Sequence, residues 1–97
     1  MRGLRFEWDA RKDRENRTKY GISFQEARTV FFDDNARLLG DPDHSEDEER
    51  FLLLGLSTHS RLLVVSHCYR QDDEVIRIIS ARRATARERR EYEDYLP

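Results

Sequence analysis

VIRIISARRATARERREY, residues 75–92, is a strand pattern that passes directly into a helix pattern. Its first residues are mostly β-branched, which favours a strand. Thr85 and Glu88 have the spacing of a capping box, in which two side chains satisfy free N–H groups at the start of a helix. Arg82 and Arg83 therefore stand just before a helix N-terminus, a place that favours anions. This junction predicts a surface that binds phosphate.

Length and composition indicate one small domain without a disulfide or a membrane segment. The 97 residues suffice for a single core, and the one cysteine, Cys68, cannot form an internal disulfide. The N-terminal residues contain no hydrophobic signal region, and the longest apolar runs are far too short to cross a bilayer. We therefore expect a cytoplasmic protein without membrane contact.

Charged residues make up 39% of the chain, and they are unevenly distributed. The net charge is −2, but removal of one acidic block leaves 18 basic and 14 acidic residues, a difference of +4. An acidic segment on a mildly basic body is consistent with a nucleic-acid enzyme or with a partner-binding protein. The six residues of the block are Asp41, Asp43, Glu46, Asp47, Glu48 and Glu49.

Two capping signals predict two helices near the N-terminus, after a short extended lead-in at residues 5–8. Asp9 can cap a helix over residues 10–20, which Gly21 would end in the left-handed conformation. Ser23 begins a second capping box, which opens a helix to about Phe32. Apolar residues at helical spacing give the second helix a stripe that we expect to be buried: Ile22, Phe24, Ala27, Val30 and Phe31.

The rest of the chain alternates between strand and turn patterns and closes with a helix. Residues 36–39 are a weak strand candidate, whereas residues 50–57, 61–70 and 74–82 are stronger ones. A last helix is expected from Arg87 to about Tyr95. The predicted fold is α+β, with two N-terminal helices, a four-stranded antiparallel sheet of three strong strands and one weak strand, and a C-terminal helix.

The register of the last two strands decides which polar side chains meet. In a regular hairpin the side chains that lie together in the core are those of Ile76, Ile78, Val64 and Cys68. On the opposite face, His67, Tyr69 and Arg77 then gather at one end. Arg82 and Arg83 then lie on opposite faces, so only one of them can share a site with Arg77. A single bulge would change this pairing.

Four motifs run through the chain in order. They are Phe6-Glu7-Trp8-Asp9 with Lys12 and Asn16; Lys19-Tyr20-Gly21-Ile22-Ser23-Phe24 with Glu26-Ala27; Asp41-Pro42-Asp43-His44-Ser45 with Glu49-Arg50; and Ile76-Arg77-Ile78-Ile79-Ser80-Ala81-Arg82-Arg83-Ala84-Thr85. In order and spacing these motifs resemble the BrnT toxins of bacterial type II toxin–antitoxin systems, which have a RelE-like fold. Tyr20 departs from the pattern, because the family commonly has His before this glycine.

The resemblance implies a function and a set of partners. It implies an endoribonuclease that cleaves RNA without a metal ion and arrests growth. It also implies neutralisation by a BrnA-like ribbon-helix-helix antitoxin, through which the complex binds its promoter DNA, and it allows a 2:2 complex. One alternative is a non-catalytic partner-binding or regulatory protein of the same fold. A simple nucleic-acid-binding module is a second one, which the near-neutral net charge does not favour.

Metal-free RNA cleavage requires proton transfer at the 2′-hydroxyl and the leaving 5′-oxygen, and charge stabilisation at the phosphate. His67 is predicted to be the acid or base because imidazole titrates near neutral pH, although a strand histidine without chemical duty is an equal alternative. Arg77 and one of Arg82 and Arg83 are predicted to hold the phosphate, because a guanidinium can bind two oxygens. A structural salt bridge is the alternative for Arg77. Tyr69 is the fourth candidate for the site.

Four more residues are candidate RNA contacts, namely Trp8, Lys12, Lys19 and Arg50. The two lysines share one face of the first helix, where a solvated surface is equally expected. Trp8 can stack on a base, although capping of the core is the usual role of an early aromatic residue. No metal or cofactor is expected, because close carboxylates in a loop are more typical of turns than of metal sites. The residues that suggest a metal site are Asp41, Asp43, His44 and Glu46.

Overall fold

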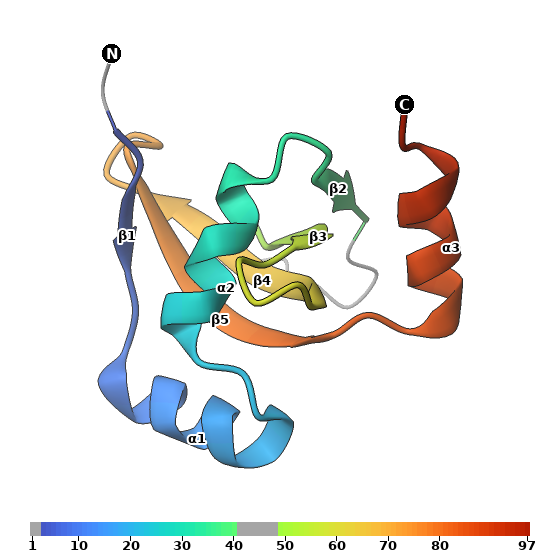
Figure 1. Cartoon of the computed structure of the whole chain (residues 1–97). Helices are drawn as coiled ribbons and strands as arrows, with labels where there is room; N and C mark the ends of the chain where they lie inside the picture. The colour runs from blue at the N-terminus through green and yellow to red at the C-terminus, as the bar shows by residue number, and fades with distance from the viewer. Residues whose placement is uncertain (1–2, 41–48) are drawn as a thin grey trace.

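The computed structural model describes residues 3–40 and 49–97, which form a five-stranded sheet and three α-helices (Figure 1). The elements are β1 (Arg5–Glu7), α1 (Ala10–Tyr20), α2 (Phe24–Thr29), the 3-10 helix η1 (Val30–Phe32), β2 (Arg37–Leu39), β3 (Phe51–Leu56), β4 (Leu62–Arg70), β5 (Val75–Arg83) and α3 (Ala86–Asp94). The strand order is β1-β5-β4-β3-β2. Among the described residues, no helix is long and apolar enough to cross a membrane.

The predicted α+β fold is confirmed, but the sheet differs from the expected one at its N-terminal edge. Residues 5–8, expected to be a lead-in, contain β1, which pairs in parallel with β5 and sets Glu7 opposite Arg77. All other neighbouring strands are antiparallel. The sheet is therefore mixed and five-stranded rather than antiparallel and four-stranded. Tertiary packing orders this short strand, since the Phe6 ring lies edge-on to Phe31 at a centroid distance of 5.3 Å.

Capping chemistry fixes the boundaries of α1 and α3, as predicted. The Asp9 side chain accepts hydrogen bonds from two backbone N–H groups in the first turn of α1, and Gly21 ends that helix with a φ of 73°. Thr85 and Glu88 form the complete capping box at the start of α3. Both helices therefore begin where the side chains supply partners for backbone groups.

The second helix is shorter than expected, and its acidic residue has a different partner. Ser23 caps α2, but the α-helix ends at Thr29 and continues as the 3-10 turn of η1. The buried Glu26 carboxylate does not complete a capping box, because it binds the Arg61 guanidinium and the Ser57 hydroxyl. These bonds, the one from Arg61 above all, hold the pKa of Glu26 at about 2. The carboxylate thereby attaches the β3–β4 turn to α2.

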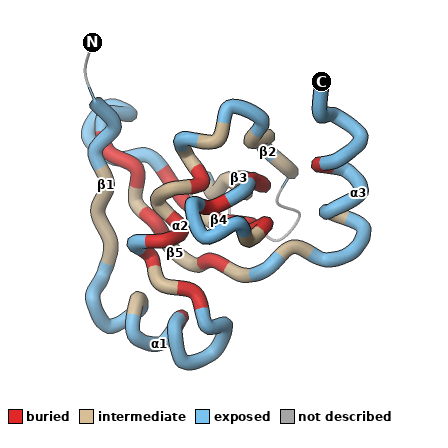
Figure 2. Tube along the Cα trace, viewed as in Figure 1, coloured by how far each residue is buried: buried red, intermediate tan, exposed pale blue. Residues whose placement is uncertain are grey.

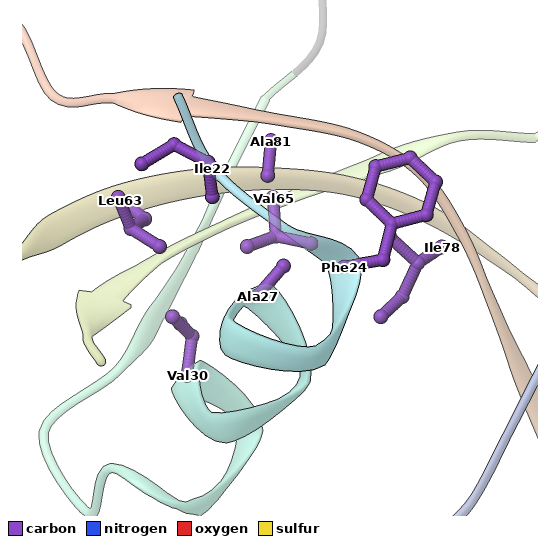
Figure 3. Packing of buried hydrophobic residues seen from close by; sticks show 8 residues of the cluster. All are labelled: Ile22, Phe24, Ala27, Val30, Leu63, Val65, Ile78 and Ala81. Atoms are coloured by element: carbon purple, nitrogen blue, oxygen red, sulfur yellow. The ribbon is translucent and has the colours of Figure 1, made fainter. Parts of the chain in front are cut away.

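The main core lies between α2 and one face of the sheet (Figure 3). The predicted stripe of the second helix is confirmed, although Phe31 is only partly buried. Buried residues are concentrated on α2 and on the strands β4 and β5 (Figure 2). The buried members of this cluster are Ile22, Phe24, Ala27, Val30, Leu63, Val65, Ile78 and Ala81.

A smaller cluster lies on the opposite face, where α3 covers one part of the sheet. Tyr92 packs there against Leu54, Leu62 and Val64. Its hydroxyl donates a hydrogen bond to Oδ2 of Asp33 at 2.7 Å. Burial and this carboxylate raise the pKa of Tyr92 to about 12. The α3 helix is therefore fixed by one aromatic residue that is both packed and hydrogen-bonded.

One buried amide attaches α1 to the sheet. Asn16 is the only buried residue of α1, and its Nδ2 donates to the carbonyl oxygens of Ala81 at 2.9 Å and Ile22 at 2.8 Å. Its Oδ1 accepts a bond from the Ala81 N–H at 3.1 Å. Because β1 pairs only with residues 75–77 of β5, the amide takes the place of a neighbouring strand at Ala81. The α1 helix therefore borders β5 (Figure 1).

Candidate active site

A β-bulge in β5 decides which side chains share the sheet face opposite α2. Ser80 pairs with Ser66, but Ile78 pairs with His67, so Ile79 is an extra residue in the strand. The alternation of side chains along β5 is therefore reversed at this point. Positions 77, 80 and 82 all come to lie on the same face.

The bulge brings two arginines of β5 together. In the β4–β5 pairing, Arg77 lies opposite Cys68, Ser80 opposite Ser66, and Arg82 opposite Val64. Positions 64, 66 and 68 of β4 share one face, so their three partners on β5 share it too. In a regular strand the two arginines would lie on opposite faces, because they are five residues apart. We call this surface the arginine face and define it by Glu7, Ser66, Arg77, Ser80 and Arg82.

Arg77 forms an ion pair with Glu7, its neighbour on β1. Nη1 of the arginine lies 2.7 Å from Oε2 of the glutamate, and the two side chains are 32% and 33% exposed. The parallel register of β1 and β5 sets these residues directly opposite each other. The pair is therefore accessible at the arginine face. It combines a cation that can bind phosphate oxygens with a carboxylate that can accept a proton.

Arg82, by contrast, fastens α3 to the sheet. Its Nη1 and Nη2 donate to the two carboxylate oxygens of Glu88 at 2.8 Å and 2.9 Å. This bidentate pair is the main cause that lowers the pKa of Glu88 to about 2, and it raises the pKa of Arg82. Glu88 also accepts a bond from the Thr85 N–H, so the same carboxylate caps α3 and holds the arginine.

Comparison with known proteins assigns the family. The model of the family described as "Ribonuclease toxin, BrnT, of type II toxin-antitoxin system" matches residues 8–88. The chain belongs to the BrnT family. Its structure is similar to the crystal structure of the Brucella abortus ribonuclease toxin BrnT, with a TM-score of 0.65 and 19% sequence identity. The match covers 86% of this chain and 99% of that chain. No curated protein matches the sequence.

The structure does not bring His67 and Tyr69 to Arg77, so the expectation that the three gather on one face is wrong. Both residues lie on the side of the sheet that carries α2. Without the bulge, Tyr69 would stand opposite Arg77. The bulge shifts this register by one residue, and Tyr69 pairs with Ile76 instead. The expected grouping of Ile76 and Ile78 with Val64 and Cys68 is wrong as well, because Val64 and Cys68 lie on the face of Arg82 and Arg77.

His67 is fully buried in a cluster of aromatic rings. Its ring centroid lies 4.8 Å from that of Phe31, 6.0 Å from that of Phe51 and 5.4 Å from that of Tyr69. Nδ1 lies 3.2 Å from the Val65 carbonyl oxygen, whereas Nε2 has no hydrogen-bond partner among the described residues. Burial lowers the pKa of His67 and so favours the neutral ring. A substrate at the arginine face cannot reach this imidazole.

The two arginines at the strand–helix junction, Arg82 and Arg83, lie on opposite faces as expected, and Arg82 is the one that shares the face of Arg77. Regular alternation places Arg83 on the face of Arg77, whereas the structure places Arg82 there. Arg83 is exposed and pairs with Leu63, a member of the core between α2 and the sheet. The bulge is again the reason.

The candidate RNA contacts of the BrnT-family chain have different environments. Trp8 packs edge-on to Phe24 at a centroid distance of 6.2 Å, which is the core-capping position. Lys12 and Lys19 are exposed on α1. Arg50 is half-buried and immediately precedes β3. Their contacts with RNA stay predictions.

Metal binding has no candidate within residues 3–40 and 49–97, because no three His, Cys, Asp or Glu side chains gather there. The residues considered as ligands from the sequence lie outside the described residues; they are Asp41, Asp43, His44 and Glu46. Metal-independent cleavage therefore stays a prediction.

Sequence reasoning missed Glu7 as a site residue, because it took residues 5–8 as a lead-in. The available signal was alternation, since Glu7 stands between Phe6 and Trp8, which both pack against the core. A polar residue between two partly buried aromatic residues is typical of a strand with one open face. Three residues give that pattern little statistical weight.

Proposed function

We propose that this BrnT-family chain is an endoribonuclease whose arginine face promotes attack of a ribose 2′-hydroxyl on the adjacent phosphate. The observation that carries the proposal is the accessible ion pair of Glu7 and Arg77 in a member of a ribonuclease toxin family. Cleavage of this kind requires a proton acceptor near the 2′-oxygen and positive charge near the phosphate. The ion pair supplies both groups side by side.

In the proposed step, Glu7 accepts the proton of the 2′-hydroxyl while the 2′-oxygen forms a bond to phosphorus. The bond from phosphorus to the 5′-oxygen breaks, and that oxygen takes a proton from solvent. The products are a 2′,3′-cyclic phosphate and a 5′-hydroxyl. Protonation of Glu7 removes the anion that had been paired with Arg77. The guanidinium charge is therefore released for the phosphate as negative charge develops there.

The other members of the arginine face support the same role. Ser66 and Ser80 are directly opposed across the strands, between the two arginines. Their hydroxyl groups can donate hydrogen bonds to a phosphate that Arg77 binds. Arg82 borders the same face, and we propose that it contributes a positive charge to the neighbouring phosphate while Glu88 holds it in place.

Two substitutions test this mechanism. Glu7→Gln keeps the shape but removes the proton acceptor, and we expect it to lower kcat by about 10²–10⁴-fold. Arg77→Lys keeps the charge but loses the planar guanidinium that can bind two phosphate oxygens, and we expect it to lower kcat at least about tenfold. Glu93→Gln and Arg90→Lys, at exposed positions of α3, are the matched controls and should keep the wild-type rate. Undiminished kcat in Glu7→Gln would remove that residue from the mechanism.

We also propose that cleavage needs no metal ion, because the Arg77 guanidinium supplies the charge that a metal ion would otherwise supply. Excess EDTA should therefore leave the cleavage rate of the purified chain unchanged. A rate that EDTA abolishes and added Mg²⁺ restores contradicts this part of the proposal.

In the cell, we propose that the chain acts in the cytoplasm as a growth-arresting toxin. Membership of a type II toxin family implies an antitoxin partner. We propose a BrnA-like ribbon-helix-helix protein, which forms a 2:2 complex with the toxin and binds promoter DNA on its behalf. The test is expression of the chain alone and together with the neighbouring open reading frame. Arrest that the neighbour relieves supports the proposal. No arrest and no RNA cleavage favour the non-catalytic alternative.

A further inference from the structure

The helix α1 is polar on every side, although it belongs to a small domain in which helices usually bury an apolar stripe. Asn16 is its only buried residue, and the only apolar or aromatic side chains are those of Ala10 and Tyr20 at its two ends. Three hydrogen bonds of one amide, rather than apolar contact, hold the helix to the sheet. Its outer surface therefore has no role in the core.

This outer surface is strongly basic. The helix has five basic residues against two acidic ones, whereas the whole chain has a net charge of −2. The acidic residue Asp13 is half-buried and accepts a hydrogen bond from the Phe24 N–H. The other acidic residue, Glu15, forms the only ion pair within α1 among the described residues, with Arg11 at 3.5 Å. The exposed basic residues are Arg11, Lys12, Arg14, Arg17 and Lys19.

The basic helix borders the arginine face along its length. Its first turn lies near Arg77, because Glu7 pairs with Arg77 and Asp9, which caps α1, follows Glu7 by only two residues. In the middle of the helix, the side chain of Asn16 is hydrogen-bonded to the backbone of Ala81 in β5. Figure 1 shows α1 running beside β5. A chain of phosphates that enters the arginine face therefore meets the cations of α1 next.

We propose that α1 is an RNA-docking helix, whose Lys12 and Lys19 side chains, seven residues apart and therefore on one face of the helix, bind the phosphates that flank the cleaved one. The inference rests on the proposed ribonuclease function and names the surface through which the substrate is held. A phosphate backbone fits better than a protein partner. Stable protein interfaces need a buried apolar or aromatic centre, which this helix lacks, whereas phosphates are bound by charge alone.

The test compares two variants with the same change in charge. The first carries Lys12→Gln and Lys19→Gln on α1. The matched control replaces Arg89 and Arg90, which are exposed on α3, by Gln. Binding is measured by fluorescence anisotropy over a range of salt concentrations. The probe is a single-stranded 2′-O-methyl RNA oligonucleotide, which lacks the attacking hydroxyl and cannot be cleaved.

We expect the α1 variant to bind the probe at least about tenfold more weakly, with a salt dependence reduced by about 1.4 in the slope of log K against log salt. The control should stay within about twofold of the wild type. On cleavable RNA, the α1 variant should raise KM more than it lowers kcat. Circular dichroism and thermal unfolding check that both variants fold.

The two proposals fail in different ways. Equal affinity and equal salt slope in the α1 variant overturn the docking role, even if the wild type cleaves RNA. An equal loss in the control variant also overturns it, since general charge would then explain binding. A wild type that binds the probe through α1 but cleaves no RNA overturns the nuclease function alone. Loss of antitoxin binding without loss of RNA binding would assign α1 to the antitoxin instead.

Discussion

Replacement of Asn16 by Ala should detach α1 from the sheet edge, and the structure gives the size of the effect. The substitution removes two bonds to Ala81 and one to Ile22, all in a buried setting. At about 1 kcal/mol net for each bond, the loss is about 3 kcal/mol. Backbone groups left without partners add about 1–2 kcal/mol where water does not reach them. The sum is a large share of the roughly 5–15 kcal/mol that stabilises a typical domain.

Urea unfolding followed by far-UV circular dichroism measures this loss in the free energy of unfolding. Thr18→Ala, at an exposed position of the same helix, is the control and should change stability by about 0.5 kcal/mol at most. Asn16→Asp is the sharper variant. It keeps an acceptor for the Ala81 N–H but turns a negative oxygen toward two carbonyl groups, so it should cost at least as much as Ala. A loss below about 1 kcal/mol in Asn16→Ala refutes the inference that this amide replaces a strand neighbour.

Three further substitutions have defined outcomes. Gly55→Ala would set a Cβ 2.8 Å from Cγ1 of Val30, so we expect a loss of about 1–3 kcal/mol; an unchanged Tm contradicts this. Tyr92→Phe removes the bond to Asp33 and should lower the free energy of unfolding by about 1.5 kcal/mol in urea. Burial lowers the pKa of His67 in the folded state below 6.5. As the pH falls below 6.5, the unfolded state therefore binds the proton first, and the free energy of unfolding decreases by up to about 1.4 kcal/mol per pH unit. His67→Phe should abolish this decline and keep RNA cleavage; a variant that retains the decline or loses cleavage contradicts the structural role.

The parts of the fold that depend on local chemistry could be predicted from the sequence. Asp9, Gly21 and Thr85 fix helix ends through bonds to backbone groups only a few residues away. The buried stripe from Ile22 to Val30 follows from helical spacing, and it packs on the sheet as expected. These features need no knowledge of which strands are neighbours.

The site could not be predicted in the same way, because it depends on a single extra residue. On either side of Ile79 the alternation of β5 is regular, so each half looks like an ordinary strand. The one trace in the sequence is a change of phase, since the apolar residues that face α2 are Ile76 and Ile78 before the bulge and Ala81 after it. With Ala81 the only apolar residue of the second half, that change carries little weight. The pairing of His67 with Arg77, inferred from regular alternation, failed for this reason.

The two arginines of the arginine face differ in what holds them, and this difference points to Arg77 as the centre of the site. Glu88 accepts hydrogen bonds from Arg82 through both carboxylate oxygens, and the pKa of Glu88, about 2, keeps this carboxylate ionised near neutral pH. Release of Arg82 would cost the bidentate pair and part of the α3 cap. Glu7 holds Arg77 through one contact at a surface that is one-third exposed, on a strand of three residues. In the proposed mechanism, Arg77 can therefore be released to a phosphate at a much lower cost than Arg82, once Glu7 has accepted the proton of the 2′-hydroxyl.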